Sequence, residues 1–355
     1  MKIEIYSPTI RRKEMDAVLT AMVEDRIGPG EQARFLVQTA REKIKFDYCL
    51  ALRSPAIALY LALKSLNIER GKGVLISALS PLYYTRVIED MGLIPHYCDV
   101  LPSTACLSRE TIEKALGLKS EGPANSIEPR CIVLHHTLGY LPDGKAIAEL
   151  GFPVIEDCSQ SYGSAMAADT DPVEKAGPVN NGVFTILGLE ERDMLTSGGG
   201  ALLYSMNRRD AAALRGLGDL PPEYGLPDMN AALAVVQFRE AAKNLLKRRE
   251  IATLYSQSAM RIRHKRLVQQ DGEYNNYAFP LVLETGMNDV KAYARKKEVA
   301  VENAFENTLA GSGVVSPDTC PEAYSLSLRT VLFPLYPRLG MTNAGKVAKL
   351  ILTLP

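Results

Sequence analysis

Apolar and polar residues alternate along the first half of the chain with two different periods. Short, nearly continuous apolar segments are typical of strands buried in a parallel sheet, whereas apolar positions at helical spacing indicate amphipathic helices. The first pattern predicts strands at residues 48–52, 74–79, 94–100, 131–136, 152–155 and 182–187. The second predicts helices at residues 9–24, 31–45, 56–66, 83–91, 108–116 and 143–150. Strands and helices that alternate in this way indicate βαβ units, so we expect an α/β fold with a mainly parallel sheet between helices.

The pattern changes in the second half. A long amphipathic helix is predicted at residues 228–258, and the elements beyond it are a strand at 277–284, a helix at 288–297, a strand at 299–304 and a helix at 343–352. A chain of 355 residues is also long for a single core. We therefore expect a large α/β domain at residues 1–240 and a small C-terminal α+β domain at 241–355, with helix 228–258 as the link. The polar segment 119–129 is predicted to be a surface loop.

Charge and composition exclude some partners. Lys plus Arg equals Asp plus Glu at 41 each, so no net field attracts nucleic acid or an anionic membrane. The first residues lack the apolar segment of a signal peptide, and no apolar run is long enough to span a bilayer. We expect a cytoplasmic protein without nucleic-acid or membrane partners. The basic segment LLKRRE at residues 245–250 is predicted to be a solvated helix face.

The six cysteines do not suggest a metal site. None forms a CxxC pair or stands at metal-ligand spacing from a histidine. Most lie in apolar segments, and we expect them to be buried as small hydrophobic residues, Cys158 included.

Candidate chemistry is concentrated in the segment GFPVIEDCSQSYGS at residues 151–164. Glu156 and Asp157 follow a predicted buried strand, and Gln160 lies three residues further on. Ligands of open α/β sheets bind outside the carboxyl ends of the strands. An acid there can face a cationic ring nitrogen, and an amide can reach a phenolic oxygen. The alternative is a helix N-cap, which Asp and Ser also favour.

Two other segments are candidates for phosphate binding. Ser54 and Pro55 open a predicted helix behind a strand, where free amides and the helix dipole attract anions, although Pro55 removes one amide. Gly198, Gly199 and Gly200 precede the strand-like ALLY. They either cradle phosphate or form a turn between antiparallel strands.

Several ordered blocks resemble one known family. Residues 74–108, HHTLGYLPDGKAIAELGFPVIEDCSQSYGS at 135–164, the helix from Asp228 to Gln237, and LFPLYP at 332–337 are similar to DegT-type (DegT/StrS) sugar-nucleotide aminotransferases. The resemblance covers most of the chain. It implies fold type I of the pyridoxal-phosphate enzymes, a homodimer with sites at the subunit interface, pyridoxal phosphate or pyridoxamine phosphate as cofactor, and a sugar-nucleotide substrate.

The resemblance also assigns roles to single residues. Asp157 matches the acid that pairs with the pyridine nitrogen, Gln160 the amide that binds the phenolic oxygen, and Thr185 a hydroxyl that holds the phosphate. The phosphate-binding helix start falls at Ser54 and Ala56. Together these residues and Tyr83 are the predicted cofactor-binding set.

The family's Schiff-base lysine has no counterpart. Its position falls near Arg192, and no lysine occurs between Lys175 and Lys243. Arginine stays protonated and cannot act as the nucleophile. Relatives that act as sugar dehydratases carry a histidine at this point, but none occurs here.

Other cofactor positions differ as well. The Gly-Thr of the phosphate-binding helix start becomes Pro55-Ala56, and the aromatic residue that stacks on the ring falls near Pro81, where Tyr83 or Tyr84 can take its place after a small shift. Glu223 and Gly225 stand where the family has asparagine and arginine.

Three hypotheses follow. The first is a homologue that does not transaminate, a pseudoenzyme that binds a sugar nucleotide or supports a partner in nucleotide-sugar or polysaccharide metabolism, its cofactor lost. The second is an active aminotransferase or dehydratase that acts on a keto-sugar nucleotide with a noncovalent cofactor. The third is unrelated chemistry in the same cleft, through Asp157, Gln160, His136 or Tyr162. His136 is equally well explained as a satisfied histidine at a strand end.

Overall fold

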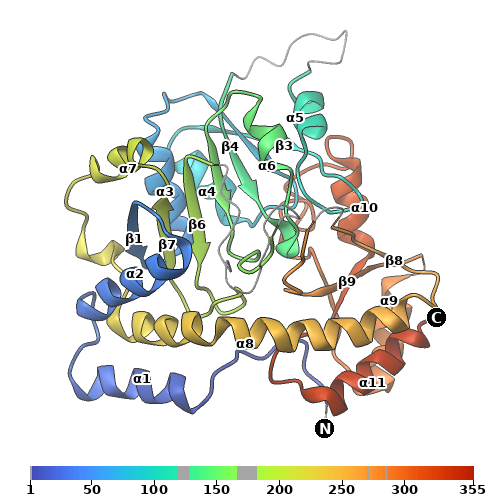
Figure 1. The fold of residues 1–355 in the computed structure, drawn as a ribbon. Helices are drawn as coiled ribbons and strands as arrows, with labels where there is room; N and C mark the ends of the chain where they lie inside the picture. The colour runs from blue at the N-terminus through green and yellow to red at the C-terminus, as the bar shows by residue number, and fades with distance from the viewer. Residues whose placement is uncertain (1, 118–127, 166–181, 270–271, 285) are drawn as a thin grey trace.

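A computed structural model describes residues 2–117, 128–165, 182–269, 272–284 and 286–355. The chain forms a large sheet and a small one, each with its own helices (Figure 1). Most of the surface loop predicted at residues 119–129 lies outside the described residues.

The large sheet contains seven strands in the order β1-β7-β6-β5-β4-β2-β3. Neighbouring strands from β6 to β3 are parallel, and β7 runs antiparallel to both β6 and β1. The prediction of a mainly parallel sheet is therefore confirmed. The strands are β1 (Tyr48–Leu52), β2 (Gly73–Ser77), β3 (Ile94–Cys98), β4 (Pro129–His135), β5 (Val154–Asp157), β6 (Phe184–Gly188) and β7 (Ala201–Ser205).

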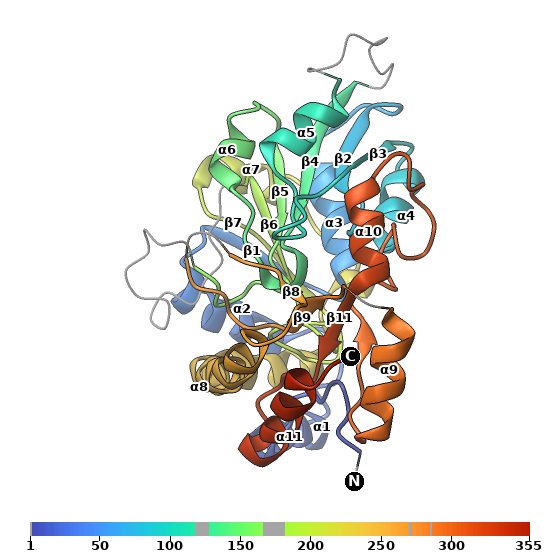
Figure 2. The same ribbon diagram turned by 90° about the vertical axis from the view of Figure 1, so that its right-hand side faces the viewer.

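Helices cover both faces of this sheet (Figure 2). Apolar side chains of α3, α4 and α7 pack on one face, and those of α2, α5 and α6 pack on the other. Because both faces are covered, β2, β5, β6 and β7 are buried along their whole length, as their apolar sequences predict, whereas the edge strands β1 and β3 are partly exposed. The helices are α1 (Arg12–Val23), α2 (Glu31–Ile44), α3 (Pro55–Ser65), α4 (Tyr83–Asp90), α5 (Arg109–Ala115), α6 (Gly144–Ala148) and α7 (Arg208–Arg215).

The small sheet is antiparallel, with strands in the order β10-β11-β9-β8. The elements of this part are β8 (Lys265–Arg266), β9 (Phe279–Val282), β10 (Glu302–Asn303), β11 (Thr330–Phe333), α9 (Met287–Lys296), α10 (Pro321–Arg329) and α11 (Gly340–Leu352). Apolar side chains of β9, β11, α9 and α11 form a second apolar cluster, whereas those of α10 belong to the cluster of the large sheet.

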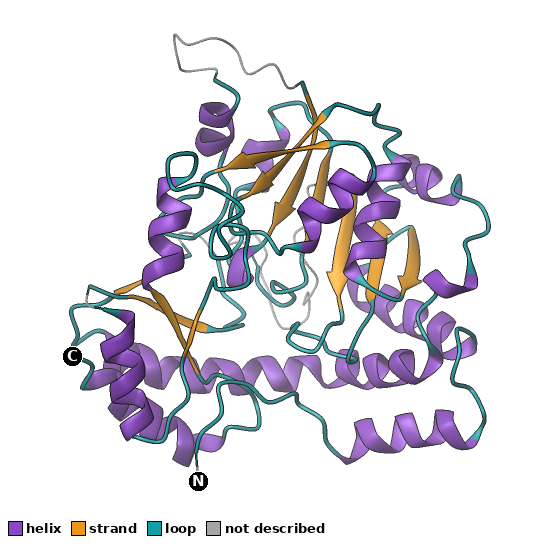
Figure 3. Cartoon of the chain, turned by 180° about the vertical axis from the view of Figure 1, so that it is seen from behind, coloured by secondary structure: helices purple, strands orange, loops and turns teal. Residues whose placement is uncertain are grey.

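Helix α8 (Asp228–Ala259) connects the two parts and runs past both (Figures 1 and 3). Its first half packs Phe238 against the cluster of α2 and β7, and its second half packs Tyr255 against the small sheet. One helix thus enters both cores, and the domain boundary at residue 240 remains a prediction.

The sequence pattern missed α7, α10, β8 and β11, which are short. The solvated face predicted for LLKRRE is wrong at Arg248, which is only 6% exposed. Its Nη1 donates hydrogen bonds to the carbonyl oxygens of Asn276, Tyr277 and Leu335, at 3.3, 2.9 and 2.9 Å. Among the described residues, no helix is long and apolar enough to cross a bilayer.

Candidate active site

The polar side chains at the carboxyl ends of β4 and β5 lie on opposite faces of the sheet. Successive side chains of a strand point to opposite faces of the sheet. Asp157 and His135 therefore share the face covered by α3 and α4, and their closest atoms, Oδ2 and Nδ1, are 3.7 Å apart. Glu156 and His136 lie on the opposite face.

The Asp157 carboxylate is buried beneath α4 and holds four hydrogen bonds. Its Oδ2 accepts from the hydroxyl of Tyr84 at 2.5 Å and from that of Tyr83 at 3.2 Å. Its Oδ1 accepts from the amide of Ser159 at 3.0 Å and from the Ser159 hydroxyl. A carboxylate offers about four acceptor sites, so these donors occupy all of them.

These donors keep Asp157 ionised. Burial alone raises the pKa of this carboxyl, but His135 and the hydroxyls of Ser159 and Tyr84 outweigh burial and hold the pKa below its usual range. Burial and the charge of Asp157 raise the pKa values of Tyr83 and Tyr84 well above the ordinary value, so both hydroxyls keep their protons and donate.

The segment after β6 brings a second carboxyl to this region. Asp193 accepts a hydrogen bond from the amide of Glu190 on Oδ2, at 2.8 Å. Burial, followed by the charges of Asp157 and Glu190, raises the pKa of Asp193 well above its usual value, although the Glu190 amide opposes the shift. The neighbouring Arg192 is 53% exposed and its Nη1 lies 2.7 Å from Glu302 Oε1.

A cavity of about 270 Å³ opens where the strand ends of the large sheet meet the segment 302–308 and β11. Backbone hydrogen bonds from Leu309 to Ser80 and from Ala310 to Ala78 fix this segment against the end of β2. The lining consists of Leu79, Pro81, His135, Thr137, Leu138, Gln160, Arg192, Asp193, Tyr277, Glu302, Asn303, Ala304, Phe305, Glu306, Asn307, Thr308 and Leu332.

The structure brings together only part of the predicted cofactor-binding set. Gln160 lines the cavity, and its Oε1 accepts a hydrogen bond from the amide of Leu138 at 2.6 Å. Asp157 and Tyr83 are in contact with each other but do not line the cavity.

The predicted phosphate-side residues are not part of the lining either. Ser54 caps α3 by accepting a hydrogen bond from the Ile57 amide at 3.2 Å, and Ala56 lies in the first turn of that helix. Thr185 is buried within β6. Gly198 to Gly200 precede a strand that is antiparallel to β6, which agrees with the prediction of a turn.

Sequence reasoning missed His135, Asp193 and Tyr277 as cavity residues. The sequence could have indicated His135, because the alternation of side chains along β4 places it on the same face of the sheet as Asp157. Asp193 follows two glutamates in a polar link and carries no comparable signal.

A buried cluster occupies the other face of the sheet. One ligand atom each from His136, Glu156 and Cys158 lies within 4.8 Å of the others. His136 Nδ1 is 2.8 Å from the hydroxyl of Ser161. Burial, reinforced by the charge of His135, lowers the pKa of His136 to about 3, and burial raises the pKa of the Cys158 thiol well above its usual value.

None of these three residues lines the cavity, and the low pKa of His136 keeps its imidazole neutral, as expected for a satisfied histidine at a strand end. Tyr162 is buried and also lies outside the cavity lining. All six cysteines are buried and free, which confirms their predicted packing role.

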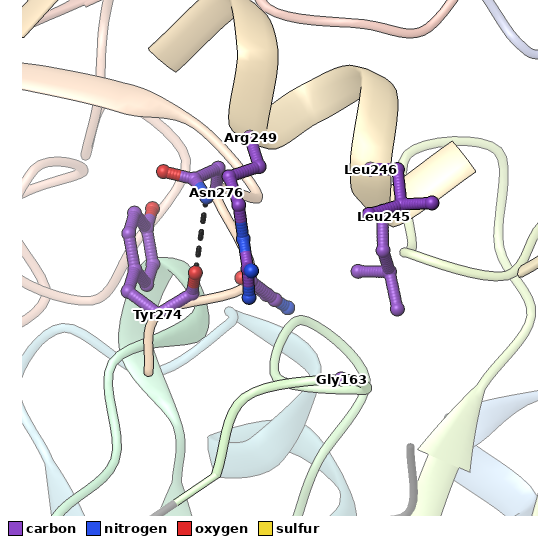
Figure 4. Close-up of a pocket in the computed structure, with 7 residues that line it drawn as sticks. Gly163, Leu245, Leu246, Arg249, Tyr274 and Asn276 are labelled. Atoms are coloured by element: carbon purple, nitrogen blue, oxygen red, sulfur yellow. Dashed lines mark hydrogen bonds between the residues drawn. The ribbon is translucent and has the colours of Figure 1, made fainter. Parts of the chain in front are cut away.

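A smaller hollow lies between α8 and the loop before β9 (Figure 4). Arg249 and Tyr274 line it, and the side chain of Asn276 donates to the Tyr274 carbonyl across 3.0 Å. Its volume of about 20 Å³ holds roughly one water molecule, so it is no candidate for a sugar or cofactor.

Comparison with known proteins decides the family. Residues 8–352 match the model of the DegT/DnrJ/EryC1/StrS aminotransferase family. The chain belongs to this family. It is 23% identical over 382 residues to a dTDP-4-dehydro-2,3,6-trideoxy-D-glucose 4-aminotransferase of Saccharopolyspora spinosa, covering 98% of this chain and 95% of that protein. It is also 28% identical over 181 residues to an L-glutamine:2-deoxy-scyllo-inosose aminotransferase of Streptomyces lividus, a match that covers 50% of this chain but only 39% of that relative.

Solved structures of aminotransferases share the fold of this chain. A sugar aminotransferase from Streptococcus pneumoniae, in its pyridoxamine-phosphate form, superposes with a TM-score of 0.86 at 17% identity, over 100% of this chain and 98% of that chain. The aminotransferase TlmJ from Streptoalloteichus hindustanus has a TM-score of 0.84 at 19% identity, over 98% and 97%. The predicted fold type I architecture is therefore confirmed.

Proposed function

We propose that this member of the family does not transaminate and instead binds a sugar ligand noncovalently in the cavity between the two sheets. One observation carries the proposal. The described lining of the cavity contains no lysine, and the position at which the resemblance expects the Schiff-base lysine falls near Arg192, whose guanidinium is paired with Glu302.

The residues present do not fit the pyridine ring of the cofactor. A structural neighbour has been solved in pyridoxal-phosphate and pyridoxamine-phosphate forms. In this chain, the acid that would pair with the ring nitrogen already accepts from Tyr83, Tyr84 and both donors of Ser159. A ring nitrogen would have to displace a buried hydroxyl from Asp157 and leave it unpaired, at a cost of about 1–3 kcal/mol.

The predicted phosphate-binding residues at the start of α3 do not fit a phosphate group either. Pro55 removes one amide from the start of α3, and the Ser54 hydroxyl occupies that of Ile57. Arg53, the adjacent cation, donates its Nε hydrogen to the carbonyl oxygen of Glu223 at 2.9 Å. The start of α3 therefore offers fewer free backbone amides to an anion than an uncapped helix start without proline.

The missing lysine removes covalent attachment. None occurs between Lys175 and Lys243, and the described lining of the cavity contains none. Arg192 cannot replace it, because its guanidinium stays protonated and faces Glu302.

The family context guides the remaining roles. We propose that the chain is a homodimer and acts in nucleotide-sugar or polysaccharide metabolism, either as a sugar-binding protein or as the partner of an active relative. The residues of the lining then hold and orient a ligand: the free amide nitrogen of Gln160 donates, and Asp193 accepts.

A cofactor titration tests the proposal. The purified protein is titrated with pyridoxal phosphate and separately with pyridoxamine phosphate, while absorbance and intrinsic tyrosine fluorescence are recorded. We expect no aldimine band and no saturable signal with either compound. Saturable binding of pyridoxamine phosphate alone would support the alternative of an enzyme with a noncovalent cofactor, and an aldimine band would disprove both.

A further inference from the structure

Arg248 is a buried guanidinium group whose charge is not matched by a carboxylate. It is 6% exposed, and its Nη1 donates to three backbone carbonyl oxygens. Its Nε and Nη2 have no hydrogen-bond partner among the described residues, and no carboxylate of those residues forms an ion pair with it. Burial lowers the pKa of Arg248, and the groups that oppose this shift are tyrosines. Because an isolated buried charge is unfavourable, the free N–H groups call for an anionic partner.

Arg248 lines a hollow beside the cavity between the sheets. The hollow lies between the N-terminal segment, α8 and β11, and its volume is about 40 Å³. It shares part of its wall with the cavity, including Arg192, Tyr277 and Glu302. Apolar residues contribute much of the remaining lining and keep the local dielectric constant low: Ile5, Ala278, Phe333 and Leu335.

The charged residues of this lining leave an excess of positive charge. They are Arg192, Arg248 and Glu302. Arg192 and Glu302 compensate each other, since Arg192 Nη1 lies 2.7 Å from Glu302 Oε1. Tyr6 donates its hydroxyl hydrogen to the carbonyl oxygen of Glu191, and the Arg192 guanidinium lies 5.6 Å from the centre of the Tyr6 ring. The charge of Arg248 therefore remains uncompensated in largely apolar surroundings.

The free donors suit a small oxyanion. The Nε and Nη2 groups of an arginine form a planar fork that matches two oxygens of one carboxylate. Tyr277 lines the same hollow, and its hydroxyl has no hydrogen-bond partner in the described part of the chain. Burial raises the pKa of Tyr277, so this hydroxyl keeps its proton and can donate. A volume of about 40 Å³ has room for formate or acetate but not for a sugar ring or a nucleotide.

We infer that this hollow binds a small monovalent oxyanion of the carboxylate class, with two oxygens on the Arg248 fork and the Tyr277 hydroxyl as a further donor. The bound anion neutralises Arg248 and so stabilises the contact of α8 with the segments before β9 and after β11. The inference goes beyond the proposed function and does not depend on it, because the guanidinium is uncompensated whether or not a cofactor binds in the neighbouring cavity.

Thermal melting in defined anions tests the inference. The protein is melted in sodium formate, acetate, L-glutamate or chloride at equal ionic strength. We expect formate or acetate to raise the melting temperature saturably, by about 3 °C over chloride at about a hundredfold excess over its Kd. L-Glutamate should bind no more tightly than acetate, because the hollow has no space for its second half. The inference is overturned if chloride and the small carboxylates act alike, or if L-glutamate binds more tightly than acetate.

Two tyrosine variants separate binding in the hollow from a general salt effect. Tyr277→Phe keeps the ring but removes the further donor, and it is expected to weaken acetate binding about tenfold. Tyr293→Phe removes a hydroxyl of α9 that donates to Thr353 Oγ1 at 2.9 Å, and it should leave the affinity for acetate unchanged. Equal affinities in the two variants would contradict the assignment of the hollow. Cofactor binding in the titration described above would disprove the proposed function and leave these expectations as they are.

Discussion

At the scale of single residues, the Asp157 carboxylate is held by side chains that lie far from it in the sequence. The acid could be placed at a strand end because a short apolar segment precedes it. Its partners could not be predicted, because Tyr83 and Tyr84 lie 74 and 73 residues away in the sequence. Only the packing of α4 on the sheet brings their hydroxyls to the carboxylate.

The two tyrosines are expected to contribute unequally to stability. Tyr84 makes the shorter hydrogen bond to the ionised Asp157 and is fully buried, so Tyr84→Phe should lower the free energy of unfolding by about 2 kcal/mol. The longer bond of Tyr83, at 3.2 Å, should cost less than about 1 kcal/mol in Tyr83→Phe. Urea denaturation followed by circular dichroism measures both values. Equal losses would contradict the arrangement around Asp157.

The raised pKa of Asp193 predicts that the free energy of unfolding changes with pH. Its folded pKa is raised, so the folded protein holds this proton more tightly than the unfolded chain does. This contribution is complete below the ordinary carboxyl pKa, and it is lost as pH rises through the folded pKa. Asp193→Asn mimics the protonated form and should raise the melting temperature at pH 7, with the gain vanishing near pH 4.

Melting curves of the Asp193→Asn variant and the unaltered protein across this pH range supply the test, with Asp90→Asn as an exposed control. A variant that is less stable at pH 7, or a gain that persists at acidic pH, would mean that Asp193 is ionised and paired in the folded state.

At the scale of elements, the clearest difference between the predicted and the observed structure lies in α8. Arg248 and Arg249 are neighbours in one basic run, yet the first is buried and the second is 50% exposed with Glu273 as its partner. A charge run read as a single face cannot distinguish them, because successive residues of a helix point about 100° apart. Arg248 ties α8 to the segment before β9 and to the one after β11.

These neighbours provide a matched pair of variants. Arg248→Met leaves three carbonyl groups without their donor and should lower the free energy of unfolding by about 3 kcal/mol. Arg249→Met removes a surface ion pair and should cost no more than about 1 kcal/mol. Chemical denaturation of the two proteins compares them directly, and similar losses would refute the tie made by Arg248.

At the scale of the whole molecule, the parallel sheet was predictable because buried strands and their covering helices each leave a strong periodic signal. The strands β1 to β6 and the long helix α8 fall close to their predicted ranges. Short elements such as β11 and α10 lie in the small sheet's region, where local sequence says little and long-range pairing decides the structure.

The site was predictable only in part. Gln160 reaches the cavity, but the segment that closes it, around Phe305 and Glu306, comes from the other sheet. No local pattern indicates that these residues meet the strand ends of β2 and β4. The full set of residues that line the cavity could therefore be identified only from the three-dimensional structure.

The central claim is that no lysine of this protein holds the cofactor, and reductive labelling tests it most directly. The protein is incubated with pyridoxal phosphate, reduced with borohydride, digested and analysed by mass spectrometry, with free lysine added in a parallel sample to suppress surface labelling. The account predicts only scattered, substoichiometric adducts that free lysine abolishes. A stoichiometric phosphopyridoxyl group on one lysine would contradict it.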